Sequence, residues 1–211
     1  MPAPSFGGGI GSLRLLAESV ARPGSIALCA AFICYVGQWS SLMIWLPTFA
    51  VDERGASQTA ASLLAAAYVA INVPGNLLGG VLMKRGAPRW AMIASASAAM
   101  GASALAVFSS TAPDWVRLAA VLVFSFLGGL IPMAVLSGTP VHARSPQHIA
   151  TTNGMVMQAS HLGQFVLPIV IAYVAAHLGG WSASLGMMLT LSAAGILSGL
   201  AVGRFERRLA R

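Results

Sequence analysis

Six apolar stretches, each about as long as a bilayer is thick, constrain this chain more than any single motif in it. They run over residues 25–49, 59–83, 91–110, 116–140, 149–176 and 181–203. A helix needs about 20 apolar residues to cross the hydrocarbon core, where every backbone N–H and C=O must be paired within its own segment. The alternating pattern of a membrane β-barrel is absent. The sequence therefore predicts an all-α, polytopic membrane protein with six transmembrane helices.

The composition supports a membrane protein and argues against a nucleic-acid-binding one. Mean hydropathy is +0.79, with 57% hydrophobic and 8% charged residues. A net charge of +7 would suggest nucleic acid as the partner of a soluble protein. Here it is explained by basic flanks that face anionic lipid headgroups, so membrane lipid is the predicted partner. Cys29 and Cys34 lie in the first stretch without metal-site spacing, and no metal or cofactor is predicted.

The basic residues fall at alternate connections between the apolar stretches. Ten of the twelve Lys and Arg residues follow this pattern: Arg14, Arg22, Lys84, Arg85, Arg89, Arg144, Arg204, Arg207, Arg208 and Arg211. Because Lys and Arg beside spans stay on the cytoplasmic side, both termini are predicted to be cytoplasmic. The predicted organisation is a cytoplasmic segment 1–24, a transmembrane domain 25–204 and a basic cytoplasmic tail 205–211. The predicted location is the bacterial cytoplasmic (inner) membrane.

Proline and glycine give the expected helix ends, kinks and close contacts. Pro47, Pro88, Pro113 and Pro140 lie near span ends and predict helix boundaries, whereas Pro74, Pro132 and Pro168 predict kinks. Glycines spaced four apart (Gly75 and Gly79; Gly195, Gly199 and Gly203) favour packing within the molecule over a dimer face. Residues 10–22 are compatible with a short interfacial helix or with a linker.

Strongly polar residues gather in three of the six stretches. No Asp or Glu lies in any stretch, so proton coupling would need His161 or a group on another polypeptide. At 100° per residue, the amides and the imidazole of the fifth stretch fall within an arc of about 140°. They line either a solute pathway or hydrogen bonds between helices. The candidate substrate-binding residues are Tyr35, Gln38, Tyr68, Asn72, Asn153, Gln158, His161 and Gln164.

Two segments carry a resemblance to a known family. Residues 79–89 (GGVLMKRGAPR) resemble the basic loop signature of the major facilitator superfamily, in the copy found in the second half of those transporters. Residues 154–168 (GMVMQASHLGQFVLP), with Gly179, Gly180 and Trp181 beyond them, resemble the eleventh helix of such proteins. The Trp45-Leu46-Pro47 ending is similar to the seventh helix of several anion- and cyanate-type members.

The resemblance implies that the chain corresponds to spans seven to twelve of a twelve-span transporter. Such a half would work by alternating access, with the first, second, fourth and fifth spans lining the pathway. Lys84, Arg85 and Arg89 would form the gating loop, although Lys84 stands where the family usually has an acidic residue. The expected partners are a small neutral or anionic solute and either a second six-span half or a second copy.

Three other identities stay open on the sequence alone. The chain could be a truncated product. It could be a non-transporting assembly subunit held by the Gly195–Gly199–Gly203 face. Ser137 and His161 also permit the dyad of an intramembrane serine hydrolase, although no further catalytic signature accompanies them and no enzyme activity is predicted.

Overall fold

The computed structural model describes residues 9–209, and within them every regular element is a helix. The elements are α1 (Gly9–Val20), α2 (Pro23–Arg54), α3 (Gln58–Lys84), α4 (Arg89–Val107), α5 (Asp114–Gly128), α6 (Leu130–His142), a short 3-10 helix (Pro146–His148), α7 (Ile149–His177) and α8 (Trp181–Leu209). Residues 1–8 of the predicted cytoplasmic segment 1–24, and residues 210–211 of the predicted tail 205–211, lie outside the described residues.

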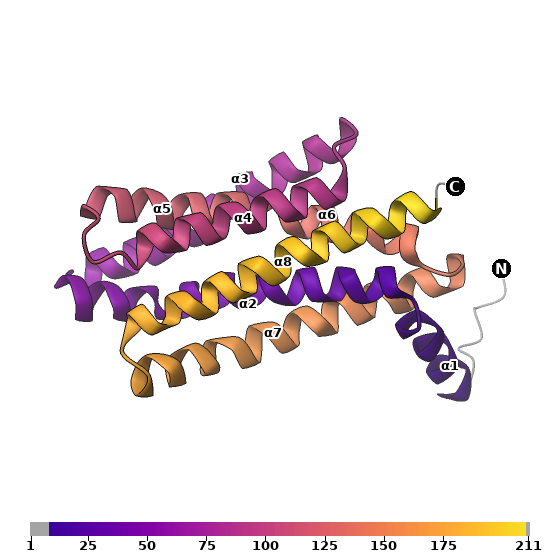
Figure 1. Ribbon diagram of the computed structural model, residues 1–211, viewed down its shortest axis with the longest axis horizontal. Helices are drawn as coiled ribbons and strands as arrows, with labels where there is room; N and C mark the ends of the chain where they lie inside the picture. Colours follow the sequence, from indigo (N-terminus) through magenta and orange to yellow (C-terminus); the bar gives the residue numbers. More distant parts are fainter. Residues whose placement is uncertain (1–8, 210–211) are drawn as a thin grey trace.

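The prediction of six membrane-spanning helices is confirmed for the described part of the chain. Six helical segments are long and apolar enough to cross a membrane, with α5 and α6 together forming the fourth. Successive spans run antiparallel, so that the start of α2 and the end of α8 lie at the same end of the bundle (Figure 1). We call this the basic end, because the connections there carry Arg22, Arg89, Arg144 and Arg204.

The spans pack around α2. Helices α7 and α8 lie against α2, α4 packs on α8 and α5, and α3 packs on α5 and α6. The largest fully buried side chains include Leu28, Tyr68, Met100, Phe124 and Ile131, which come from five different helices. Helices α3 and α7 are the least buried spans together with α8, so they lie at the edges of this bundle.

The fourth span is broken at Gly129, between α5 and α6. Pro132 has no N–H to donate to the carbonyl of Gly128, so the kink predicted at Pro132 is realised as a helix break one turn earlier. Helix α3 crosses at this break. A Cβ on Gly75 would collide with the carbonyl oxygen of Phe126, and one on Gly129 would lie 2.8 Å from the carbonyl oxygen of Asn72. Only glycine permits this backbone approach.

The second glycine row packs inside the molecule as well. A Cβ on Gly199 would lie 3.0 Å from the Ala94 nitrogen, and one on Gly203 would lie 2.6 Å from Cγ of Trp90. Both glycine rows therefore serve packing within the bundle, as the sequence favoured. The alternative of an assembly subunit held by Gly195, Gly199 and Gly203 is wrong in its choice of surface, because α4 covers that face.

Two of the predicted helix boundaries are wrong. Pro47 lies inside α2, which continues to Arg54, and Pro140 lies inside α6, which ends at His142. Pro88 and Pro113 do mark boundaries, because they directly precede α4 and α5. A helix that packs along its length against neighbours tolerates the one hydrogen bond that an internal proline removes.

The sequence left residues 10–22 undecided between a short interfacial helix and a linker, and most of them form helix α1. Glu18 ties α1 to the connection between α6 and α7: its carboxylate lies 2.9 Å from Arg144 Nη1 and 3.0 Å from His148 Nε2, and it accepts a hydrogen bond of 2.9 Å from Arg14 Nε. The hydrogen bonds from Arg14 and His148, with the charge of Arg144, hold the pKa of Glu18 below its ordinary value.

Candidate functional site

Three of the predicted site residues meet in a hydrogen-bonded network between α2, α3 and α5. The Asn72 amide donates to the Tyr35 hydroxyl (3.2 Å) and to the Ser125 carbonyl (2.8 Å). Asn76 donates back to the Asn72 side-chain oxygen at 2.7 Å. Tyr35 and Tyr68 are 5% and 0% exposed. We call this group, with Trp39 and Ser125, the Asn72 network.

The hydroxyl of Ser125 joins the second half of the Asn72 network. It donates to the Tyr68 carbonyl at 2.6 Å and accepts from the Trp39 indole at 2.9 Å. The Tyr68 hydroxyl donates to the Trp39 carbonyl at 3.0 Å. The sequence did not indicate the roles of Ser125 and Trp39, because a lone Ser or Trp in an apolar stretch carries no pattern. The polar atoms of this network are therefore bonded to one another.

Gln38, one turn after Tyr35, bonds α8 and not α3. It is 1% exposed, donates to the Cys34 carbonyl at 3.0 Å, and accepts from the Ser192 hydroxyl at 2.9 Å. The two candidate substrate-binding residues of α2 therefore bond different helices, Tyr35 to α3 and Gln38 to α8. Both hydrogen-bonding groups of the Gln38 amide are used within the bundle.

The four predicted residues of α7 are exposed together. Asn153, Gln158, His161 and Gln164 all lie on the outside of this bundle, and their side chains make no hydrogen bond to any other residue in 9–209. The opposite face of α7 packs on α2, where Gly163 lies close to the carbonyl of Ile33. We call these four residues the α7 polar row.

The predicted gating loop follows α3 at the basic end. Lys84 and Arg85 are exposed, whereas Arg89 turns inward. Its guanidinium donates to the Ser137 hydroxyl and to Glu206 Oε1, each at 3.1 Å, and His142 Nε2 lies 3.7 Å from the same Glu206 oxygen. The start of α4 and the ends of α6 and α8 are therefore joined by one acidic residue.

The arrangement around Ser137 does not form a hydrolase dyad in the described chain. The Ser137 hydroxyl donates to the Ala134 carbonyl at 3.0 Å and accepts from Arg89. His161 makes no hydrogen bond to Ser137 or to another described residue. A nucleophile needs its general base within hydrogen-bond reach, so the serine hydrolase alternative loses its geometric basis.

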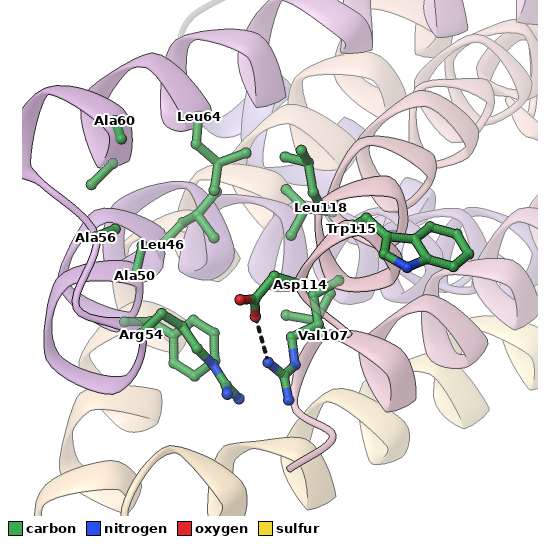
Figure 2. A pocket seen from close by; sticks show the side chains of 14 residues that line it. Leu46, Ala50, Arg54, Ala56, Ala60, Leu64, Val107, Asp114, Trp115 and Leu118 are labelled. Atoms are coloured by element: carbon green, nitrogen blue, oxygen red, sulfur yellow. Dashed lines mark hydrogen bonds and ion pairs between the residues drawn. The ribbon is translucent and has the colours of Figure 1, made fainter. Parts of the chain in front are cut away.

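A cavity of about 560 Å³ lies at the end of the bundle opposite the basic end (Figure 2). Its apolar walls come from α2, α3, α5 and the last residue of α4, and include Leu46, Leu64, Val107, Leu118 and Val121. Arg54, Asp114 and Arg117 also line it. None of the predicted site residues contributes to this cavity, which we call the Arg54 pocket.

Comparison with known proteins places the fold. The family model of the Major Facilitator Superfamily matches residues 27–209. Among solved structures, the chain is similar to the E. coli fucose:proton symporter FucP, with 20% sequence identity and a TM-score of 0.73. The similarity covers 94% of this chain but 45% of the symporter chain, so this chain spans about half the length of that protein. No curated protein matches the sequence.

These matches establish the fold and the family. They do not test the resemblance to anion- and cyanate-type members, which stays a prediction. At 20% identity the likeness to the symporter concerns the fold alone. The family model, by contrast, reaches into all six spans, from the first turns of α2 to the end of α8. The chain belongs to the major facilitator superfamily of membrane transporters.

Proposed function

We propose that this chain is the C-terminal half, spans seven to twelve, of a secondary transporter that moves a small solute by alternating access. In this mechanism two six-helix halves rock about a solute site at mid-membrane depth. A second polypeptide or a second copy of the chain supplies the other half. The half-length coverage of the symporter supports this division.

The observation that carries the proposal is the α7 polar row. Unpaired amides and an imidazole on a membrane-spanning helix are costly against lipid, and such groups normally face a bundle interior or a water-filled cavity. The bundle described here uses the other face of α7, so the row requires a second half or an aqueous pathway. Gln158, His161 and Gln164 then supply hydrogen bonds to the solute.

The absence of Asp and Glu from the six predicted stretches bears on the kind of solute. A cationic solute held by charge would need a carboxylate within the membrane, so this half suits a small neutral or anionic solute. The Asn72 network contributes rigidity beside the pathway, because its polar atoms already bond one another. The proposed gate lies at the basic end, which we place in the cytoplasm with both termini.

Cysteine accessibility tests whether the α7 polar row faces water. In cells that express a Cys29→Ala, Cys34→Ala background, Gln158→Cys should react with a charged, membrane-impermeant thiol reagent supplied to spheroplasts or to inverted vesicles. Leu197→Cys is the matched control, because Leu197 is 67% exposed on α8 among apolar neighbours and should face lipid. Equal, slow labelling of both cysteines in both preparations would place the row in lipid and contradict the proposal.

Uptake tests the role of individual side chains. Vesicles that contain this chain together with the second half are first screened for uptake of radiolabelled neutral and anionic solutes, with fucose among them. Uptake of a solute that they transport should then fall at least tenfold in Gln158→Ala or His161→Ala. His177→Ala is the control, since His177 lies on the same helix outside the row and bonds the Tyr173 carbonyl. Unchanged uptake in both Gln158→Ala and His161→Ala would contradict the assignment of the α7 polar row as the solute site.

A further inference from the structure

The Arg54 pocket lies between α3 and α5, on the side of their tight crossing that is farther from the basic end. The two helices touch backbone to backbone where Gly75 meets Phe126, which lies well inside the bundle. Toward the opposite end, the start of α3 carries the small residues Ala60 and Ala61, and Ala56 precedes the helix, which leaves the space between the helices unfilled. A cavity of about 560 Å³ is within the range of small-molecule sites.

The walls of the Arg54 pocket are suited to an apolar chain. Leu46 and Val121 are buried, Leu64 is partly buried, and Leu118 is half exposed. Trp115 borders the pocket, is 72% exposed and points away from it, as expected of an indole at the headgroup level (Figure 2). The pocket therefore extends from the membrane interface toward the bilayer interior.

Two guanidiniums and one carboxylate line the pocket, and Asp52 and Glu53 precede Arg54 at the exposed end of α2 without lining it. The guanidinium of Arg117 is matched, because it donates to Asp114 at 2.8 Å and to the Ser109 carbonyl at 2.9 Å, as the dashed line in Figure 2 shows for the acidic partner. Arg54 has no carboxylate partner among the described residues. Its one hydrogen bond, to the Ser109 carbonyl, is long at 3.4 Å, and its guanidinium lies 5.8 Å from the centre of the Phe49 ring.

We propose that the Arg54 pocket binds a single-chain amphiphilic anion. The carboxylate or phosphate head would accept hydrogen bonds from Arg54, and the apolar chain would lie between α3 and α5. A small hydrophilic anion is disfavoured, because the apolar walls would desolvate it without replacing its hydration. An uncharged ligand with the same apolar chain would leave the Arg54 guanidinium without an anionic partner in the pocket. The site does not depend on the transport proposal, since none of the α7 polar row contributes to it.

Laurate is the probe for this site. The purified full chain in a maltoside detergent should bind radiolabelled laurate with saturation at one molecule per chain, measured by scintillation proximity. Dodecanol, which has the same chain without the charge, should compete at least about tenfold more weakly. Propionate, which has the charge without the chain, should not compete. Competition by lysophosphatidylglycerol, which has one acyl chain, would identify a phospholipid as a source of the ligand, and its failure would leave free fatty acids as the source.

Substitutions place the laurate in the Arg54 pocket. Arg54→Gln should weaken binding about tenfold, because one charge-assisted hydrogen bond is lost. Leu64→Trp should abolish binding by filling the pocket, and Ala60→Leu provides a second filling variant at an exposed position. Arg85→Gln removes the same charge at the basic end and should leave affinity unchanged.

Three results would each overturn the proposal. The first is competition by dodecanol equal to that by laurate. The second is an Arg54→Gln affinity no weaker than that of Arg85→Gln. The third is full laurate stoichiometry in both Leu64→Trp and Ala60→Leu.

Discussion

Helices α3 and α7 are equally exposed in this bundle, yet they place their amides in opposite directions. In each, 22% of the most apolar part of the span is buried. The outward face of α3 carries Leu63, Val73 and Leu77, while Asn72 turns inward and bonds Tyr35 and Ser125. The outward face of α7 carries Gln158 and His161 beside exposed apolar residues such as Phe165.

This difference separates two uses of polar residues within a membrane. An amide whose bonds are satisfied inside one bundle joins helices, and the apolar surface that remains is compatible with lipid or with an apolar partner surface. Amides that stay unpaired on the outside require a second polar surface or water. Changes in the paired region should therefore cost stability, and changes in the unpaired region should not.

The largest effect is expected where the paired region depends on backbone contact. Gly75→Leu should destabilise the bundle by more than about 3 kcal/mol, because its side chain would collide with the Phe126 carbonyl, which cannot move away without displacing α5. The measurement is unfolding in detergent, followed by circular dichroism. Gly80→Leu is the control, because a Cβ there meets open space. Equal unfolding of the two variants would mean that the α3–α5 crossing is not close in the membrane.

A smaller loss of stability is expected at Asn72. Asn72→Leu removes two bonds to neighbouring helices, and buried bonds of this kind contribute about 0.6 kcal/mol each on average in membrane bundles. The bond that Asn76 donates to the Asn72 side chain is lost as well, for a total of about 1–2 kcal/mol. Thermal unfolding of the purified chain measures the change. A stability equal to that of the unchanged chain would show that the Asn72 network does not hold α2, α3 and α5 together.

The number and approximate limits of the spans were predictable, because length and apolar composition alone decide whether a helix can cross a membrane. The boundaries at Pro47 and Pro140 were not. Whether a proline ends a helix depends on the packing of the residues beyond it, and the turn of α2 after Pro47 packs Phe49 against Phe108 and Trp181. Those partners are distant in the sequence.

The polar residues were identifiable from the sequence, but their direction was not. A helical wheel gives the angle between Gln38 and Tyr35, and it does not say which neighbour each one faces. Gln38 faces α8 because Ser192 lies there, and Tyr35 faces α3 because Asn72 lies there. The Arg54 pocket gave no signal at all, since its walls come from four helices that only the fold brings together.

The unpaired region should show almost no stability effect. Gln158→Leu in the isolated chain should change the free energy of unfolding by less than about 0.5 kcal/mol, because the side chain is exposed and bonds no other described residue. The same thermal unfolding applies, with Asn72→Leu measured alongside it. A cost for Gln158→Leu as large as that for Asn72→Leu would erase the distinction between the two regions.

The smallest and most local effect concerns Glu18, which joins α1 to the α6–α7 connection through Arg144 and His148. The pKa of Glu18 lies below its ordinary value of 4.5, so its contribution to the docking of α1 is present above that value. The contribution is lost as the pH falls through the lowered pKa. Hydrogen exchange of α1 amides, corrected for intrinsic rates, should therefore stay constant from neutral pH to about 4.5 and rise only below it.

Glu18→Gln isolates the carboxylate in this experiment, because the imidazole of His148 remains in place. Amide exchange in α1 should be faster in Glu18→Gln than in the unchanged chain at neutral pH. The rise below the ordinary pKa should disappear in this variant, since the amide does not titrate. A rise of the same size in Glu18→Gln would assign the pH response to another group. Protection of the amides in α3 should be unaffected in either chain, because α1 packs against α7 and α2 instead.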